Sequence, residues 1–417
     1  MNTLNNHDTH LVRDIRLLLA AMGLNSLPLG YTLVVLPIYL KQIGFSGEVI
    51  GAIVAVSSIA NTIALIPFAI VADRYGRRHF AIWGFLSATL AYLLFAFTRD
   101  LPSLLLASAI GGVGFAGGFS SAVWTPAWTA LLAEKTSHEK RTTAFAWAQG
   151  IWTVALTAGS AMSVLPNQLR VGLQLSYLPS NEYTFLILAA FAVMSSLVVL
   201  PVPEKKREPL QLNEVASQGI FRLKSLPQIS KFSLTLGLVG FASGISVQLL
   251  ALWFNRMYGV NETDLGPWFA AAEITSLVVV PIIPRLTRSL GTSVSVLSTQ
   301  GLSAALLGSM ILAPTYQLAG FVFIVRNFFM NISWPIQQSY LMGTVTPEER
   351  ASASAITSTI WGIGSSIGPV MAGYLLSGAT FVSISAPLLI GAGIYLVSAI
   401  AFYLLFRRIP PPEETYA

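Results

Sequence analysis

The chain has 417 residues, of which 54% are hydrophobic and only 10% are Asp, Glu, Lys or Arg. This balance excludes a water-soluble globular protein, because the apolar runs are longer than a buried core needs. The net charge of +6 is explained by the placement of the basic residues described below, so we expect no nucleic-acid partner.

Twelve apolar segments follow a polar start at Met1–His10, which has no features of a cleavable signal peptide. Each is long enough to cross about 30 Å of hydrocarbon as a helix. Helices are expected because a segment in lipid must satisfy its own backbone hydrogen bonds, so the predicted fold class is an all-α membrane protein. The expected spans are 17–40, 47–71, 79–98, 102–132, 143–165, 183–203, 232–255, 264–284, 292–313, 316–345, 352–377 and 381–406.

The basic residues predict the orientation of these spans. With the N-terminus inside, 19 of the 24 Lys and Arg residues fall on the cytoplasmic side, 4 fall outside and one, Arg326, lies within a span. Because inside loops carry the excess of positive charge, we expect a multi-pass plasma-membrane protein with both termini in the cytoplasm.

The longest polar stretch divides the spans six and six. It predicts an N-terminal bundle at 1–203, a cytoplasmic linker at 204–230 and a C-terminal bundle at 231–417. The two halves repeat, as expected for transporters with a binding site near the middle of the membrane. A shift of 215 residues places Gly44, Gly51 and Gly76 on Gly259, Gly266 and Gly291, and a shift of 209 places Pro126, Arg141 and Trp152 on Pro335, Arg350 and Trp361.

The polar gap between the second and third spans carries the strongest motif. It reads Ala69-Ile-Val-Ala-Asp73-Arg74-Tyr75-Gly76-Arg77-Arg78. The pattern resembles the signature loop of the major facilitator superfamily, with Ala69 where that family usually has Gly.

The resemblance implies two pseudo-symmetric six-helix bundles and a secondary transporter that works by alternating access. It also implies a cytoplasmic gate formed by Asp73, Arg74, Gly76 and Arg77. The alternative is that these Arg residues only set the topology.

Two signatures of drug–proton antiporters within that superfamily are altered. Ser108 stands where those proteins carry an Arg before Gly112-Val-Gly114. The Gly-Pro motif expected in span 143–165 occurs instead at Gly368-Pro369. The subfamily is therefore not identified.

Two charged residues are expected deep in the membrane, where each is expensive unless it is paired. Glu273 lies 9 residues into span 264–284, and Arg326 lies 10 residues into span 316–345. Both spans run from outside to inside, so the two side chains reach a similar depth of about 15 Å. They form either a structural ion pair or a functional site in which Glu273 couples transport to protons.

Span 316–345 is unusually polar. Asn327, Asn331, Trp334 and Gln338 recur on one helix face, while Arg326, Ser333 and Gln337 lie on the adjoining face. Such a stripe faces a water-filled cavity or a partner helix. The predicted substrate-binding residues are Asn25, Tyr31, Trp124, Gln149, Trp152, Gln248, Arg326, Asn327, Asn331, Trp334, Gln338 and Trp361.

The sequence predicts a transporter rather than an enzyme. It has no Walker loop, no nucleophile–base arrangement and no Cys, and its four His residues lie on the expected cytoplasmic side, so we expect no ATP, metal or cofactor. The first interpretation is efflux of a small organic solute in exchange for protons, by a monomer in the lipid bilayer. The alternative is symport or facilitated uptake of an organic anion held by Arg326. A membrane-embedded receptor or enzyme with the same fold is a third class.

Overall fold

The structure is a computed structural model that describes residues 2–111, 117–204, 224–346 and 349–407. These ranges are helical and contain no strand, which confirms the predicted all-α class. The helices are α1 (Asn2–Gln42), α2 (Gly47–Tyr75), α3 (Arg77–Phe97), α4 (Leu101–Ile110), α5 (Gly118–Glu134), α6 (His138–Ala161), α7 (Leu165–Leu173), α8 (Tyr177–Val199), α9 (Leu226–Ser246), α10 (Leu250–Tyr258), α11 (Glu262–Val278), α12 (Ile283–Leu290), α13 (Thr292–Ser309), α14 (Tyr316–Thr344), α15 (Arg350–Ser377) and α16 (Phe381–Phe406).

Eight helices of the described ranges are long and apolar enough to cross a membrane, and the α11–α12 pair, bent by 62°, makes nine if it forms one span. The other three predicted spans are also largely helical: 102–132 corresponds to α4 and α5, 143–165 to α6, and 352–377 to α15. The count of twelve crossing helices stays a prediction.

The chain forms two compact units by its internal contacts. Unit 1 contains Met1–Gly44, Val56–Leu210 and Glu262–Ala270, and unit 2 contains Phe45–Ala55, Gln211–Asn261 and Ala271–Ala417. Most of the predicted linker, residues 205–223, lies outside the described residues. The division at 203 and 231 therefore stays a prediction.

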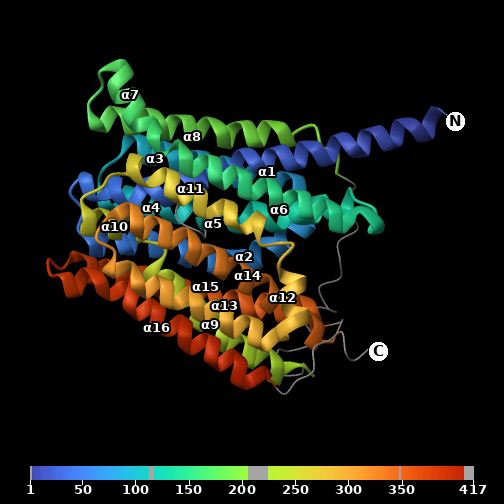
Figure 1. Cartoon of the computed structure of the whole chain (residues 1–417). Helices are drawn as coiled ribbons and strands as arrows, with labels where there is room; N and C mark the ends of the chain where they lie inside the picture. Colours follow the sequence, from blue (N-terminus) through green and yellow to red (C-terminus); the bar gives the residue numbers. More distant parts are fainter. Residues whose placement is uncertain (1, 112–116, 205–223, 347–348, 408–417) are drawn as a thin grey trace. The chain divides into compact units, whose positions relative to one another are not determined.

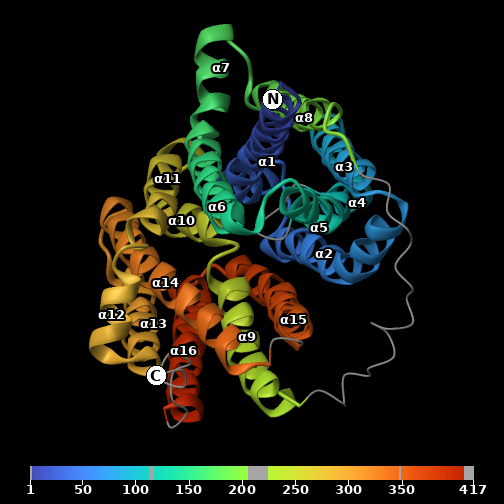
Figure 2. The same cartoon turned by 90° about the vertical axis from the view of Figure 1, so that its right-hand side faces the viewer.

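Each unit repeats the same four helix pairs. In unit 1, α1 packs on α6 and α8, and α3 packs on α5 and α8; in unit 2, α9 packs on α15 and α16, and α13 packs on α14 and α16. These neighbours are visible within each unit when the helices are viewed from the side (Figure 1) and closer to their axes (Figure 2). The pairing matches the sequence repeat and confirms the pseudo-symmetric bundles.

Repeated glycines have the same local role in both halves. Gly76, with φ 110°, follows α2, and its repeat partner Gly291, with φ 74°, follows α12. Only glycine adopts such angles without strain, so both helices end where the repeat predicts. Gly159 of α6 and Gly368 of α15, a second pair, each lie against the backbone of the first helix of their own unit.

Each unit has an aromatic core. In unit 1 the Trp124 ring lies 5.3 Å from Phe85 and 6.1 Å from Trp128. In unit 2 the Phe232 ring lies 4.4 Å from Phe406 and 5.7 Å from Phe402.

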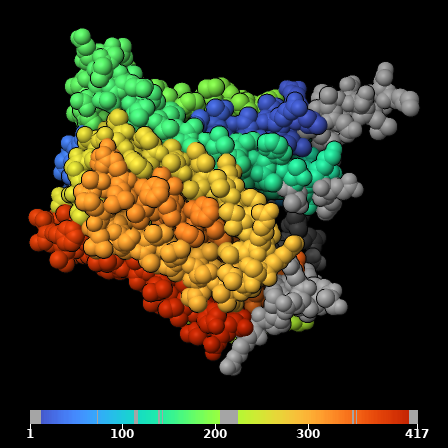
Figure 3. Space-filling model, viewed as in Figure 1, coloured from blue at the N-terminus to red at the C-terminus, as the bar shows by residue number. Residues whose placement is uncertain are grey.

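Apolar side chains also cover much of the surface. The orange part of Figure 3 belongs to α13 and α14, where Leu302, Leu318 and Phe321 are exposed. A bilayer would cover such side chains, which explains why large apolar residues are exposed on this face.

Candidate functional site

A small pocket lies inside unit 1, between α1, α3, α5 and α6. Its volume is about 20 Å³ for the centre of a water-sized sphere, which is room for about one water molecule. A site that encloses a drug-sized ligand needs about 300–1,000 Å³. The pocket can therefore hold one functional group of a ligand rather than a whole ligand. Its lining is Asn25, Leu29, Ala88, Tyr92, Gly117, Ser120, Ser121, Trp124 and Trp152.

Close packing of α3 on α5 fixes the wall of this pocket. The Ser120 hydroxyl donates to the Gly84 carbonyl at 2.7 Å, and the backbone of Trp124 lies directly over Gly84. Trp128, one turn later, donates its indole Nε1–H to the Leu18 carbonyl at 2.8 Å. Trp124 is only 3% exposed, so its ring is a rigid surface rather than a mobile one.

The pocket brings together three of the predicted substrate residues of unit 1 and leaves out two. Asn25, Trp124 and Trp152 line it. Tyr31 does not, because it is fully buried with its ring edge against Phe185 of α8. Gln149 is exposed on α6 and is not part of the lining.

In unit 2 the polar stripe of α14 contacts two neighbouring helices. Asn331 donates its Nδ2–H to the Thr275 hydroxyl of α11 at 3.0 Å. The Trp334 ring packs edge-on against Trp361 of α15, with the ring centroids 6.2 Å apart. Gln338 is half-buried one turn after Trp334. The stripe thus joins two predicted aromatic residues that are 27 positions apart in the sequence.

Arg326 has other partners than Glu273, so the structure does not support the ion-pair alternative. Within the described residues no ion pair joins the two side chains. The guanidinium lies 5.0 Å from the ring centre of Tyr395 on α16 and donates from Nη1 to the Asn327 side-chain oxygen at 3.0 Å. Although Arg326 is only 3% exposed, its Nε and Nη2 have no hydrogen-bond partner in the described part of the chain.

The adjoining face of α14 is a structural contact. Gln337 donates to the side chains of Gln300 at 3.0 Å and Ser333 at 2.9 Å. Gln300 of α13 in turn donates to the Tyr395 carbonyl at 3.0 Å. This buried network joins α13, α14 and α16, so polarity on this face does not indicate a cavity.

Gln248 also has a structural contact. It is 2% exposed and lies where α9 gives way to α10. Its Nε2 donates to the Ser365 carbonyl of α15 at 3.0 Å. Gln248 therefore stabilises the break between α9 and α10. From the sequence alone, a polar residue with this structural role looks the same as one that binds a ligand.

The loop after α2 is organised by an acid that the sequence prediction missed. The Glu204 carboxylate, beyond the end of α8, accepts the backbone N–H groups of Arg77 at 2.6 Å and Arg78 at 3.1 Å. A carboxylate at a helix N-terminus is stabilised by the helix dipole, so Glu204 fixes the start of α3. No local sequence signal points to a partner 127 residues away.

The predicted gate residues are partly described. Arg77 reaches Glu134 of α5, with Nη1 and Oε2 3.7 Å apart. Arg74 is exposed and lies 5.4 Å from the Tyr75 ring centre. The side chain of Asp73 lies outside the described residues. The gate therefore stays a prediction.

Unit 2 has a similar cap at its first helix. The Glu349 carboxylate accepts the backbone N–H groups of Lys224 at 2.7 Å and Ser225 at 2.9 Å, just before α9. The Ser225 hydroxyl and these N–H groups hold the pKa of Glu349 below its usual value.

Known proteins match nearly the whole chain. A family model described as Major Facilitator Superfamily matches residues 18–369, and a second match covers residues 234–417. Multidrug resistance protein 1 of Bacillus subtilis (strain 168) is 23% identical over 369 residues, which are 87% of this chain and 89% of that protein. Quinolone resistance protein NorA of Staphylococcus aureus (strain MSSA476) is 21% identical over 391 residues, with 90% and 92% covered.

A solved structure shows the same fold. A bacterial homolog of the human lysosomal transporter Spinster, in an inward-facing and unoccupied conformation, superposes with a TM-score of 0.73 at 15% identity, covering 95% of this chain and 97% of that one. Since the family model spans more than half of the sequence, the chain belongs to the Major Facilitator Superfamily, and it is a membrane transporter rather than an enzyme.

Proposed function

We propose that this transporter exports a small organic solute with an aromatic or apolar part, in exchange for protons. The observation that carries this proposal is the unit 1 pocket, where two indole rings and a carboxamide surround room for one functional group. Indole faces bind flat apolar groups, and Asn25 can donate to or accept from a polar substituent. The matched relatives are named for multidrug and quinolone resistance, which supports export.

In unit 2 the proposed substrate contacts are on α14 and α15. Trp334 is 37% exposed and packs on Trp361, so this ring pair offers an apolar surface that is not buried. Asn327, Asn331 and Gln338 supply polar groups on the same side of α14.

Glu273 is the proposed coupling residue. It is half-buried on α11, and no ion pair to it occurs among the described residues. A carboxylate within a span is stabilised when a proton neutralises it, so its protonation can favour one state of the transport cycle over another. In the proposed topology both termini lie in the cytoplasm and the protein in the plasma membrane, which the excess of basic residues in the expected inside loops supports.

A transport assay tests this proposal. Inverted membrane vesicles that contain the protein should accumulate a fluorescent quinolone when the lumen is acidified, and a protonophore should abolish the accumulation. Glu273→Gln should lose gradient-driven accumulation while keeping exchange at equal pH. The matched control is Asp264→Asn, which neutralises an exposed acid of the same helix and should transport normally. Full gradient-driven transport by Glu273→Gln would overturn the coupling role.

Arg326 favours a second candidate, transport of an organic anion. Two of its guanidinium nitrogens are buried without a partner, and a carboxylate could accept from both. The same vesicles can be used to test benzoate transport. This candidate is favoured over the first if the wild type transports benzoate but no quinolone, and if Arg326→Gln loses benzoate transport.

A further inference from the structure

Unpaired oxygen atoms gather around the first turn of α11, in the part of that helix that belongs to unit 1. They come from four elements that the fold brings together: α1, the short helix before α7, α8 and α11. Each is buried and has no hydrogen-bond partner in the described part of the chain. They are Glu262 Oε2, Tyr177 Oη, Asn181 Oδ1, Tyr31 Oη and Ser163 Oγ.

Tight helix packing forms the cluster. Gly266, one turn after Glu262, lies directly against Ser163, so that any side chain at 266 would clash with the Ser163 hydroxyl. Glu262 is therefore held at 4% exposure although it begins its helix. Because an exposed acid is normal at a helix start, its burial here requires an explanation.

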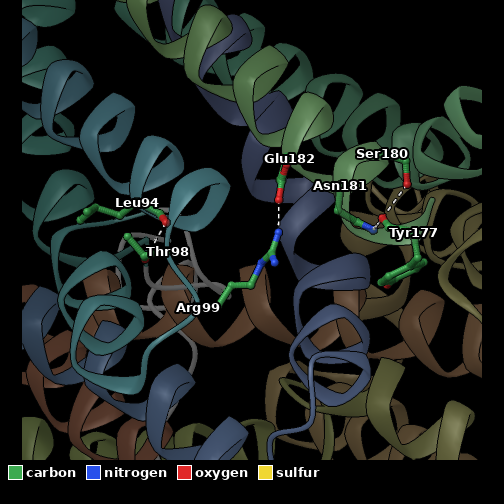
Figure 4. Close-up of polar contacts among 7 residues, drawn as sticks. All are labelled: Leu94, Thr98, Arg99, Tyr177, Ser180, Asn181 and Glu182. Atoms are coloured by element: carbon green, nitrogen blue, oxygen red, sulfur yellow. Dashed lines mark hydrogen bonds and ion pairs between the residues drawn. The ribbon is translucent and has the colours of Figure 1, made fainter. Parts of the chain in front are cut away.

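Tyr177 of α8 lies near this acid, and Asn181, one turn later, lies near Tyr177. The Tyr177 hydroxyl lies close enough to the Glu262 carboxylate for the two groups to interact, although not in hydrogen-bonding geometry. Asn181 donates its Nδ2–H to the Tyr177 carbonyl at 3.0 Å, which leaves its side-chain oxygen unpaired. Figure 4 shows Tyr177, Ser180 and Asn181 together at the start of α8, apart from the neighbouring Arg99–Glu182 ion pair.

The charged groups around Glu262 do not neutralise it. Arg170 of α7 is exposed, and its guanidinium lies over the Tyr177 ring at 5.9 Å from the ring centre. Within the described residues no ion pair to Glu262 is formed. The other titratable groups that influence the cluster are Asp264 on α11, Tyr31 and Tyr39 on α1, and Tyr177 on α8.

We propose that Glu262, Tyr177, Asn181 and Tyr31, here called the Glu262 site, bind a proton taken from the extracellular side. The proposal rests on the proposed proton coupling and topology. A hydronium ion transfers one proton to a Glu262 oxygen and leaves as water, so the site changes from negative to neutral and no other bond changes.

The hydrogen-bond inventory supports this chemistry. The unpaired Asn181 oxygen can only accept, and protonation of Glu262 adds one O–H donor to those of the two Tyr hydroxyls. The two Tyr hydroxyls can then donate to the remaining carboxyl oxygen or to a water molecule. An unpaired carboxylate in the same place would carry an uncompensated charge out of water, which is the more expensive arrangement.

Infrared difference spectroscopy of the purified protein in lipid tests the site directly. On lowering the pH, the wild type should show the C=O stretch of a buried carboxylic acid that is absent in Glu262→Gln and present in both Glu273→Gln and Asp264→Asn. A spectrum of Glu262→Gln identical to that of the wild type, or no buried-acid band in the wild type, would overturn the proposal.

Tyr177→Phe provides a second variant in case Glu262→Gln does not fold. The Tyr177 hydroxyl stabilises the ionised form of Glu262. Its loss should therefore raise the pH midpoint of the Glu262 C=O band by about one unit, which corresponds to tenfold tighter proton binding. An unchanged midpoint would remove Tyr177 from the site and contradict the proposal. The infrared titration does not depend on transport. If transport were independent of the pH gradient, the proposed function would be contradicted, but the titration of Glu262 would be unaffected.

Discussion

The variant Gly84→Ala, compared with a control glycine, should show how much the close packing of α3 on α5 contributes to stability. Gly84 lies on α3 directly beneath Trp124 of α5, which lines the unit 1 pocket. A Cβ at this position would lie 2.6 Å from Trp124 Cβ, 2.8 Å from its backbone N and 3.0 Å from its Cα. All three atoms are fixed by the α5 backbone, so no rotamer change removes the clash.

The cost follows from these distances. Carbon atoms in contact normally lie about 3.5–4.0 Å apart, so α3 and α5 must separate by about 1 Å or Trp124 must move into the pocket. Overpacking of this kind costs about 1–3 kcal/mol. Alanine also gains about 1 kcal/mol over glycine within a helix, which offsets part of the cost.

Gly150→Ala is the matched control. Gly150 lies on α6, and nothing is within 4 Å of the position that its Cβ would take. It should show the propensity gain alone, so the difference between the two variants isolates the clash at about 1–3 kcal/mol. Thermal unfolding in detergent, followed by tryptophan fluorescence, should give a lower midpoint for Gly84→Ala than for Gly150→Ala. Equal midpoints, or the reverse order, would refute the packing argument.

Two further outcomes are expected. The chain has no Cys, so single Cys residues can be introduced and labelled. Cys at the exposed positions Ser46 and Ser176 should react with an impermeant thiol reagent applied outside cells, whereas Cys at Ser137 and Ser289 should not. The opposite pattern would mean that the topology is reversed. Glu349→Gln should lower the unfolding midpoint at pH 7. Because the folded-state pKa of Glu349 lies below 4.5, the stability that its carboxylate contributes is lost as the pH falls through that folded-state pKa, and the gap to the wild type should close there; a gap that is still unchanged at about pH 2 would contradict the capping role.

The sequence was sufficient for the helices and their repeat because both depend on local pattern. Long apolar runs leave the helix as the stable structure in lipid, and Gly76 and Gly291 end their helices at equivalent points. Asn25, Trp124 and Trp152, which the sequence predicts as substrate contacts, line the unit 1 pocket, and substrate binding by them stays a prediction.

The direction of individual side chains was not predictable in the same way. Counting residues along a span gives the depth of Arg326 but not the helix that it faces, and its ring partner Tyr395 is 69 positions later. Tyr31 and Gln248 satisfy the same sequence criterion as Asn25, yet they are buried against α8 and α15. Glu262, which we propose as a proton site, was not among the predicted residues because an acid directly before an apolar run is expected to lie in a loop.

A buried charged residue without a partner is a better indication of function within these spans than a buried polar residue. Gln300, Gln337 and Ser333 are as deeply buried as Arg326, but they are neutral and bind one another. An unpaired oxygen on a buried neutral amide costs about 1–3 kcal/mol, whereas an unpaired buried charge costs more. Under the two proposals above, Arg326 would gain from a bound anion and Glu262 from a bound proton, and both can be tested without knowing the natural substrate.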